Sequence, residues 1–416
     1  MKKFGRFIKF ICVVAVLVLL ATFVGPKILL HFAMQPAVAE SYRYSEAFEN
    51  TYDAVREQLE QRVQLLEQAG VRVQTYSHPI DEENGLYIDN IYLPSTEEET
   101  NLILLTTGVH GIEGYIGAAM LEVFFGEIYP ELDKSTTGVL IVANVNPYGM
   151  KNMRRYNENN VDLNRNFILD WAEFDLATNQ NYPKVESFLG PQKAIKNALW
   201  HDVEFWGLLA KNALTVGADT VSDALLGGQY QYPQGVYYGG TEDQASTVFL
   251  KRVFEQCLES PYENIVHIDI HSGYGPRYNM VVFNSVFETM TEAETQAAFG
   301  YDNVIAHDSE SFYATTGDTT DYFYRLEAQT ESGTEVFSTC FEFGTIGDGF
   351  LDSIISLKYT VDENQQHWYP TQDATSAEIV RQHYLELFYP TETQWREKTV
   401  EDFTAAARGV LEAKLK

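Results

Sequence analysis

Residues 101–129 decide the fold, and they read NLILLTTGVHGIEGYIGAAMLEVFFGEIY. Residues 101–108 form a continuous apolar run of strand length, and residues 114–129 have the apolar spacing of a helix. A second apolar run, GVLIVANVNP, follows at 138–147. A strand, a helix and a strand at this spacing predict an α/β fold with a largely parallel sheet.

Two further apolar runs, at residues 264–273 and 336–344, extend this sheet. Strands that are apolar throughout are typical of sheets covered by helices on both faces. We therefore predict helices above and below the sheet. The other expected elements are a helix over 45–68, strands near 71–76 and 86–93, and two helices after residue 375.

The chain divides into two parts by composition. Residues 1–39 are a basic leader with an apolar segment, and no linker rich in Pro or Ser divides the chain after residue 40. We therefore predict one catalytic domain over residues 40–416. Residues 170–260 are mostly helical in pattern and carry the loop GGQYQYPQGVYYGG at 227–240, so we expect them to be an insertion in that domain.

The net charge also separates these two parts. The 416 residues carry a formal net charge of −30, although residues 1–39 contain basic residues and no acid. A polyanion repels phosphate backbones, so nucleic acid is excluded as a partner. Residues 10–24, FICVVAVLVLLATFV, are uncharged and follow the basic start. This order indicates a signal anchor or a signal peptide.

Two alternatives stay open for the apolar segment: it is kept as an anchor, or it is removed by cleavage. Small residues at 37–39 form a possible cleavage site, but they lie well beyond the apolar run. We therefore favour an uncleaved anchor that contacts the membrane through residues 10–24. Because flanking basic residues stay in the cytoplasm, we expect the catalytic domain to be extracytoplasmic. Secretion after signal cleavage is the alternative.

Polar side chains gather where the apolar strands end, and ligands of open α/β sheets bind at those ends. His110 and Glu113 form an HxxE motif after the first strand, and His271 lies at the end of the third. Two histidines and one glutamate with an open fourth position make a catalytic zinc arrangement. The other polar residues at these ends are Arg154, Arg155, Asp162, Asn164, Arg165 and Glu342.

Two residues share a strand face with His271. His267 and Asp269 precede it by four and two residues, and side chains two apart on a strand point the same way. We expect His267 to be packed or to support the site rather than to bind metal. Asp269 either supports the site or is structural.

The ordered set of motifs resembles the zinc carboxypeptidase superfamily, which includes the funnel-shaped carboxypeptidases and their aspartoacylase and desuccinylase relatives. The resemblance covers roughly residues 95–350 and implies a mostly parallel mixed sheet flanked by helices. The loop at 227–240 looks like a narrower branch, grouped largely as a domain of unknown function. The matching segments are His110 to Glu113, NPYG at 146–149, Arg154-Arg155, DLNRN at 162–166, His271-Ser272 and Glu342.

The resemblance implies roles for these residues. Glu342 would be the general base, and Asp162 would orient the first zinc histidine. Arg155, which we favour over Arg154, would stabilise the oxyanion. The ligands of one zinc ion per chain would be His110, Glu113 and His271.

It also implies a substrate subsite. Asn164 and Arg165 would grip a terminal carboxylate, and Tyr313, which lies eight residues before Asp321, would close over it. Thr320 matches the position of the side-chain pocket. A small polar residue there leaves the side-chain preference open.

Three functions stay open at this point. The first is a zinc-dependent hydrolase that cleaves an amide or peptide bond next to a free carboxylate. The second is a small-molecule amidohydrolase that acts on N-acyl amino acids. The third is a non-catalytic anchored binding protein, against which the intact ligand and base set argues. The oligomeric state and a possible disulfide between Cys257 and Cys340 also stay open, although we favour two unpaired cysteines.

Overall fold

The computed structural model describes residues 2–33, 42–309, 315–330 and 333–416. Within these residues, eight strands form one sheet in the order β1-β2-β4-β3-β5-β8-β6-β7. The strands are β1 (Gln74–Asp81), β2 (Leu86–Leu93), β3 (Asn101–Thr107), β4 (Thr137–Ala143), β5 (Asn264–Ser272), β6 (Met280–Asn284), β7 (Val304–Ile305) and β8 (Glu335–Phe343).

The centre of the sheet is parallel and its flanks are mixed. Strand β3 pairs in parallel with β4 and β5, and β5 pairs in parallel with β8. Strand β2 pairs antiparallel with β4, and β6 pairs antiparallel with β8. Every residue of β3 and β5 is buried, as expected for strands covered on both faces. The predicted mixed α/β architecture is confirmed, and the short strands β6 and β7 were not predicted.

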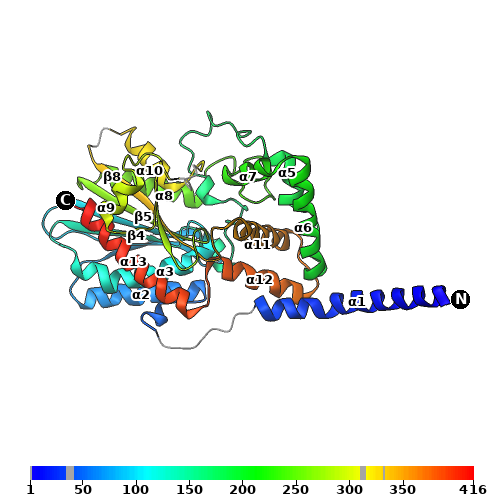
Figure 1. Cartoon of the computed structure of the whole chain (residues 1–416). Coiled ribbons are helices and arrows are strands. Elements are labelled where there is room, and N and C mark those ends of the chain that lie inside the picture. The colour runs from blue at the N-terminus through cyan, green and yellow to red at the C-terminus, as the bar shows by residue number, and fades with distance from the viewer. Residues whose placement is uncertain (1, 34–41, 310–314, 331–332) are drawn as a thin grey trace.

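Helices cover both faces of this sheet (Figure 1). On one face, α2, α3 and α13 bury side chains against alternate strand residues such as Ile103. On the other face, α8 and α10 pack on the intervening residues, such as Leu104. The helices are α1 (Lys2–Ala33), α2 (Tyr52–Gln68), α3 (Gly114–Val123), α4 (Pro147–Lys151), α5 (Tyr182–Leu189), α6 (Ala198–Thr215), α7 (Ala218–Leu226), α8 (Ala245–Glu259), α9 (Glu292–Phe299), α10 (Thr319–Glu327), α11 (Phe350–Trp368), α12 (Ala374–Phe388) and α13 (Thr393–Lys414).

Helices α5, α6, α7 and α11 form a lobe beside the sheet (Figure 1). This helical lobe has its own apolar cluster, in which Phe188, Phe205 and Val221 pack with Leu357 of α11. The expected insertion at 170–260 is therefore helical over α5 to α8, and α11 completes its core from a segment whose helix was not predicted.

The region before the sheet differs in detail from the expected helix over 45–68. A single 3₁₀ turn covers Ser45–Ala47, and α2 begins only at Tyr52. The cause is Thr51, whose side chain accepts a hydrogen bond from the backbone N–H of Ala54 and so caps the helix. Elsewhere, Cys257 and Cys340 are both free, so the possible disulfide does not form.

Helix α1 is long and apolar enough to cross a membrane over Val13–Ala33. By length and composition it fits a signal anchor or a signal peptide. Its C-terminal part packs against α6 and α12, while its N-terminal part extends away from the rest of the chain (Figure 1).

Candidate metal centre and active site

The loop after β3 is held tightly against the NPYG turn. The backbone N–H groups of Gly111 and Ile112 donate to the carbonyl groups of Arg155 and Arg154. A Cβ on Gly111 would lie 2.2 Å from the carbonyl carbon of Gly149, so only glycine fits at this contact. These contacts fix the 3₁₀ turn Gly111–Glu113 and direct its side chains to the carboxyl end of the sheet.

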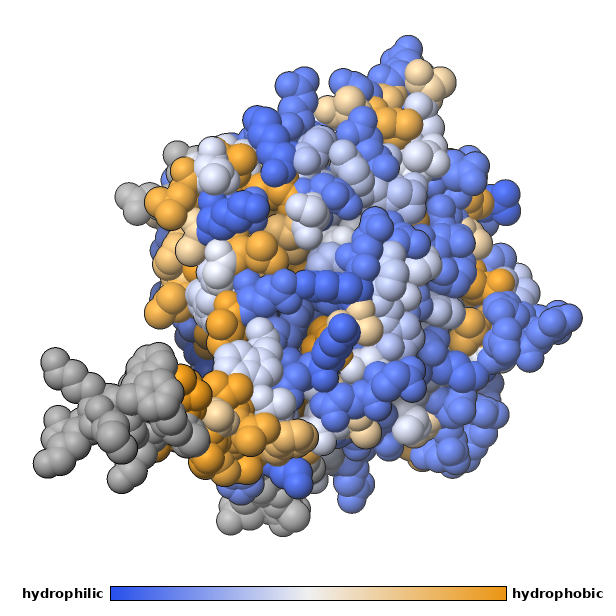
Figure 2. All heavy atoms as spheres, turned by 90° about the vertical axis from the view of Figure 1, so that its right-hand side faces the viewer, coloured by the Kyte–Doolittle hydropathy of each residue, from blue (hydrophilic) through white to orange (hydrophobic). Residues whose placement is uncertain are grey.

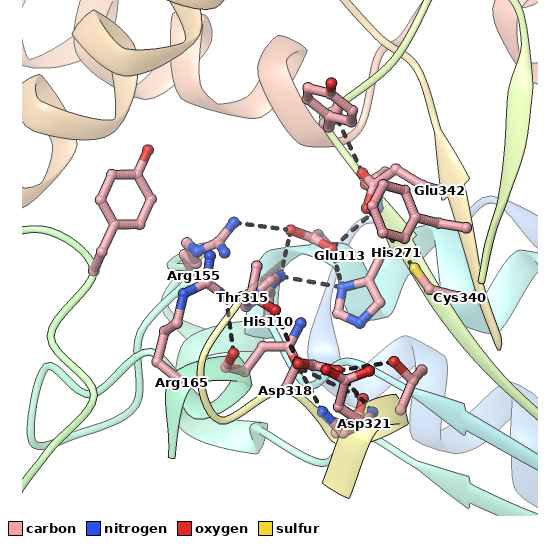
Figure 3. Close-up of a pocket in the computed structure, with 18 of the residues that line it drawn as sticks. His110, Glu113, Arg155, Arg165, His271, Thr315, Asp318, Asp321, Cys340 and Glu342 are labelled. Carbon is pink, nitrogen blue, oxygen red and sulfur yellow. Dashed lines mark hydrogen bonds and ion pairs between the residues drawn. The ribbon is translucent and has the colours of Figure 1, made fainter. Parts of the chain in front are cut away.

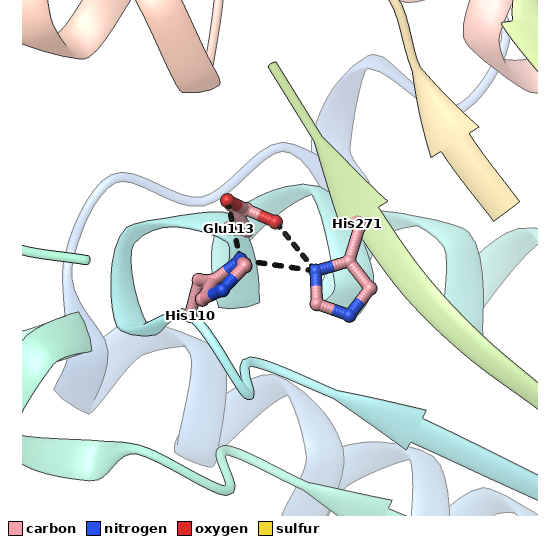
Figure 4. Close-up of side chains that lie close together, drawn as sticks. All are labelled: His110, Glu113 and His271. Carbon is pink, nitrogen blue, oxygen red and sulfur yellow. Dashed lines mark hydrogen bonds and ion pairs between the residues drawn. The ribbon is translucent and has the colours of Figure 1, made fainter. Parts of the chain in front are cut away.

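Three side chains meet at this end of the sheet (Figure 4). Nδ1 of His110 lies 3.1 Å from Nδ1 of His271, and 2.9 Å from Oε1 of Glu113. Nδ1 of His271 lies 2.9 Å from Oε2 of Glu113. One ligand atom from each residue falls within 4.8 Å of the others, and all three side chains are buried. The structure therefore brings together the three residues that the motifs indicated as metal ligands.

An aspartate holds the opposite nitrogen of each imidazole. Nε2 of His110 lies 3.0 Å from Oδ1 of Asp162, and Nε2 of His271 lies 2.9 Å from Oδ2 of Asp269. An ionised carboxylate accepts a hydrogen bond, so each Nε2 carries the proton. The Nδ1 atoms of both rings then face each other and the Glu113 carboxylate, and a metal ion would bind these atoms in their unprotonated form.

Three electron-pair donors that face one another fit a cation. Nitrogen ligands of one tetrahedral zinc ion lie roughly 3.3 Å apart, because each lies about 2.0–2.1 Å from the ion. The 3.1 Å between the two Nδ1 atoms is close to this spacing. Carboxylates behind metal-binding histidines are a common support, since they orient the ring and raise its basicity. The donor set therefore fits a divalent metal, and two imidazoles with one carboxylate suit zinc.

The charges around the cluster favour a bound cation. Burial raises the pKa of Asp269, but His271 outweighs burial and lowers it to about 2. Burial lowers the pKa of His271, yet Asp269 and Glu113 together raise it well above its usual value. Burial also acts against ionised Asp162, but Arg155 and His110 hold its pKa well below the usual range. Such a site attracts positive charge, and a divalent cation competes with the proton for it.

The two adjacent arginines have different surroundings. Arg155 lines the cavity at the cluster, where its Nε donates to Oδ2 of Asp162 at 2.8 Å. Its Nη1 lies 3.7 Å from Oε1 of Glu113. Arg154 instead points into the interior, where its Nε pairs with Oε1 of Glu363 at 2.7 Å. Of the two candidates for the oxyanion arginine, the geometry favours Arg155.

The guanidinium of Arg165 lies at the same cavity, and few of its N–H donors are hydrogen-bonded to described residues. The residue is 6% exposed, and among the described residues its side chain makes one hydrogen bond, from Nη1 to the carbonyl of Asn164. Its Nε is buried without a partner in the part of the chain described. Buried charged donors are normally paired, so this arrangement suits an incoming anion such as a carboxylate.

The Gly- and Tyr-rich loop at 227–240 supports Arg165 from behind. The hydroxyl of Tyr230 donates to the carbonyl of Arg165 at 2.8 Å. A Cβ on Gly228 would lie 2.8 Å from Cδ of Arg165, and a Cβ on Gly239 would lie 2.7 Å from its carbonyl oxygen. The amide oxygen of Asn164 accepts from the backbone N–H of Thr319 and so ties this turn to the start of α10.

Glu342 lies at the carboxyl end of β8, in register with His271 on β5. Its Oε1 accepts a hydrogen bond of 3.0 Å from the backbone N–H of Tyr274. Burial and the Glu113 carboxylate raise the pKa of Glu342 to about 8. A metal ion at the cluster would oppose the charge of Glu113 and lower this pKa. The side chain lines the cavity and is therefore positioned to exchange a proton with a bound molecule.

These side chains surround one cavity of about 210 Å³ (Figure 3). The helical lobe contributes Leu225 of α7 and Thr360 of α11 to its wall, and the loop at 227–240 contributes Tyr237. Two of the described residues that the motifs indicated do not line this cavity: Asp162 lies behind His110, and Arg154 points into the interior. Tyr313 lies outside the described residues. The predicted residues that line the cavity are His110, Glu113, Arg155, Asn164, Arg165, His271 and Glu342.

One wall of the cavity is acidic, which the sequence did not reveal. Thr320 lines the cavity as expected, but Asp318 and Asp321 line it too (Figure 3). Asp318 accepts from the backbone N–H of Asp321 and caps α10, and Ser285 donates to Oδ1 of Asp321 at 2.5 Å. Burial and Asp318 raise the pKa of Asp321 to about 6. The feature of the sequence that could have indicated this wall is Asp318, which caps the N-terminus of α10.

The fold and the cluster define an α/β protein with a candidate metal centre at the carboxyl ends of its parallel strands. The chain belongs to the family described as "Protein of unknown function (DUF2817)", whose model matches residues 48–402. This family is the branch that the loop at 227–240 indicated. No curated protein matches the chain.

Solved structures similar to this chain include metallocarboxypeptidases. Bovine thrombin-activatable fibrinolysis inhibitor, in complex with tick carboxypeptidase inhibitor, is 15% identical with a TM-score of 0.44; the match covers 82% of this chain and 99% of that chain. Carboxypeptidase A from Helicoverpa armigera is 12% identical with a TM-score of 0.44; that match covers 86% of this chain and 79% of the other.

Proposed function

We propose that the chain is a zinc-dependent hydrolase that cleaves an amide bond next to a free carboxylate. One observation carries the proposal: two aspartate-supported imidazoles and Glu113 converge beside a cavity that also holds a general base and two arginines. A non-catalytic binding protein needs no glutamate such as Glu342 aligned beside such a cluster.

The metal centre and the arginines would together bind the substrate and stabilise the negative charge that develops on it. A zinc ion held by His110, Glu113 and His271 would supply Lewis acidity to the scissile carbonyl and to a water molecule. Arg165 binds the substrate carboxylate through its free donors and so fixes the position of the scissile bond. Arg155, ion-paired on one side with Asp162, directs its other nitrogens to the charge that develops on the carbonyl oxygen.

The proton transfers belong to Glu342. Its carboxylate takes a proton from the attacking water at one oxygen and delivers it to the leaving nitrogen. The Tyr274 backbone N–H holds the other carboxylate oxygen in place during both transfers. Asp162 and Asp269 keep the two imidazole rings fixed, so that the cluster does not rearrange as the substrate charge changes.

The size of the cavity favours a second candidate, an amidohydrolase acting on N-acyl amino acids. Pockets for drug-sized ligands usually span about 300–1,000 Å³, and this cavity of about 210 Å³ is smaller. Such a space holds one amino acid with a short acyl group, or only the terminal residue of a peptide. Both candidates share the same residues and differ in what lies on the acyl side of the bond.

We propose further that α1 is an uncleaved anchor and that the catalytic domain lies on the outer side of the membrane. Support comes from the basic residues that precede the apolar run and from the packing of α1 on α6 and α12. In intact cells, added protease should then degrade the catalytic domain and leave the basic N-terminus protected.

Substrate profiling of the detergent-purified full chain tests the function. Zinc-loaded protein is incubated with a peptide library and with a panel of N-acyl amino acids, each with and without a chelator. Chelator-sensitive release of C-terminal residues from peptides supports the carboxypeptidase reading. Turnover of N-acyl amino acids alone supports the second candidate. Turnover of neither class by zinc-loaded protein overturns both.

A further inference from the structure

Helix α6 carries a row of apolar side chains on its outer face. Trp200, Val203, Trp206 and Leu214 are 41%, 57%, 40% and 88% exposed. At about 100° per residue, these four side chains fall within roughly a third of the helix circumference. Gly207 and Ala210 lie in the same arc and are also exposed. The α6 face, as we call these residues, is a continuous apolar strip.

The α6 face lies on the side from which α1 leaves the domain. The Asn197 side chain donates to the carbonyl of Thr22 at 2.9 Å, and Nε1 of Trp200 donates to Oγ1 of Thr22 at 3.0 Å. Leu199 packs closely on Gly25, where a Cβ would lie 2.6 Å from its Cδ2. The start of α6 is therefore bonded to the side of α1.

The two helices run across each other. In Figure 1, α6 stands at the edge of the domain, and α1 passes its lower end and extends beyond it. Figure 2 looks onto this side of the molecule, where hydrophobic side chains gather at the lower left and extend upward along the same edge. If α1 crosses a membrane, α6 lies along the surface of that membrane.

The rise per residue along α1 gives the depth of the start of α6 relative to the membrane boundary. The charged residues that bound the apolar run are Lys9 and Lys27, and the helix rises about 27 Å from one to the other at 1.5 Å per residue. This length matches a hydrocarbon core of roughly 30 Å. Thr22 lies about 7 Å inside the Lys27 boundary by the same rise. Trp200, which is bonded to Thr22, therefore lies just below the outer boundary of the hydrocarbon core, at about the depth of Thr22.

We propose that the α6 face inserts into the outer interface of the membrane that α1 spans and holds the catalytic domain against the lipid surface. The side chains suit this place, since tryptophan rings favour the level of the lipid headgroups and apolar chains the region just below. Glu204 and Lys211 are exposed and border the apolar arc on one side, where charged side chains can stay in water. The proposal rests on α1 being an anchor and goes beyond the proposed chemistry.

Quenching of tryptophan fluorescence by brominated lipid tests the proposal. The full chain is reconstituted in vesicles of phosphatidylethanolamine and phosphatidylglycerol, with and without bromine on the acyl chains. We expect strong quenching of the wild type, loss of most of it in the double variant Trp200→Phe/Trp206→Phe, and wild-type quenching in the control Trp171→Phe. Because the replaced rings are partly exposed, the double variant keeps the fold, which circular dichroism checks.

Two results would overturn the proposal in different ways. Protein that stays with the vesicles but is quenched equally in the wild type and the double variant, or in neither, rules out insertion of the α6 face and leaves the anchor intact. Protein that does not stay with the vesicles rules out both the anchor and the inserted face. Neither result bears on hydrolysis, which is measured separately in detergent.

Discussion

His267 and His271 lie four residues apart on the same face of β5, and both are buried, yet their neighbours differ. The ring of His267 contacts two hydroxyl groups: Nε2 lies 2.9 Å from Oγ1 of Thr106, and Nδ1 lies 2.8 Å from Oγ of Ser338. Burial lowers the pKa of His267 to about 4. At His271 the carboxylates of Asp269 and Glu113 outweigh burial and raise the pKa.

The comparison shows that position in the sheet decides what a histidine does. In the middle of β5, the ring is a neutral bridge between β3 and β8. At the carboxyl end, where loops bring in side chains from other strands, the ring joins a charged cluster that fits a metal. If the sheet is divided in this way into a structural interior and a reactive edge, replacements at the two places should have different effects.

Replacing each histidine in turn should separate metal binding from stability. His271→Ala should lose stoichiometric zinc and reduce hydrolysis to background, because it removes a ligand. His267→Ala should keep zinc near one per chain and lose about 1–3 kcal/mol of unfolding free energy, since it leaves Ser338 without its partner. Metal analysis and urea unfolding measure the two effects. Loss of zinc in His267→Ala, with the fold intact, would contradict the assignment of His267 as structural and His271 as a metal ligand.

The adjacent arginines should divide in the same way. Arg155→Gln should lower kcat roughly 10²–10³-fold, because it removes a donor aimed at the developing negative charge. Arg154→Gln should cost about 3–5 kcal/mol of stability, because it leaves the buried Glu363 unpaired. Kinetics at saturating zinc and urea unfolding are the measurements. The assignment fails if folded Arg154→Gln loses more kcat than Arg155→Gln.

The aspartates behind the rings should tune metal affinity without abolishing it. Asp162→Asn and Asp269→Asn should each weaken zinc binding roughly 10–100-fold, because the ring they orient becomes a poorer donor. Competition against a chromophoric chelator measures the affinity. Asp243→Asn is the control, since Asp243 pairs with Lys251 away from the cluster. Equal losses of zinc affinity in all three variants would contradict a specific role of Asp162 and Asp269 behind the zinc-binding rings.

The pH dependence of stability that His267 contributes is measured as a difference between two slopes. Its pKa is about 4 in the folded chain and about 6.5 in the unfolded chain. Between these values the unfolded state binds more protons, so stability rises with pH and is lost on acidification from 6.5 towards 4. Full loss amounts to about 3 kcal/mol at 1.36 kcal/mol per unit. Urea unfolding in excess chelator should give a shallower pH slope for His267→Gln than for wild type; parallel slopes would contradict this.

Much of the fold and of the site could be predicted because both depend on local patterns. Continuous apolar runs mark the central strands, and the polar residues that follow them must meet at one edge. The surroundings of Arg154 and Arg155 could not be read from sequence, since neighbours in the chain point to different sides and only the fold supplies Glu363 to one of them. The acidic wall at Asp318 and Asp321 was missed because helix-capping aspartates are common and only the packing of α10 turns them to the cavity.

The short edge strands and the core of the helical lobe could not be predicted from local patterns either. Strands β6 and β7 are short, so their pattern was too weak to predict them. The core of the helical lobe joins residues 182–236 to α11, a contact between distant segments that no local pattern encodes. What the sequence could not supply is therefore long-range packing, not the identity of the reactive groups.

The most direct test of the central claim compares wild type with Glu342→Gln, measuring zinc content and hydrolysis on the same preparations. We expect one zinc ion per chain in both proteins, chelator-sensitive hydrolysis by the wild type, and a loss of roughly 10²–10⁴-fold in the variant. A folded wild type that binds no zinc would contradict the account, and so would a zinc-loaded variant that turns over substrate as fast as the wild type.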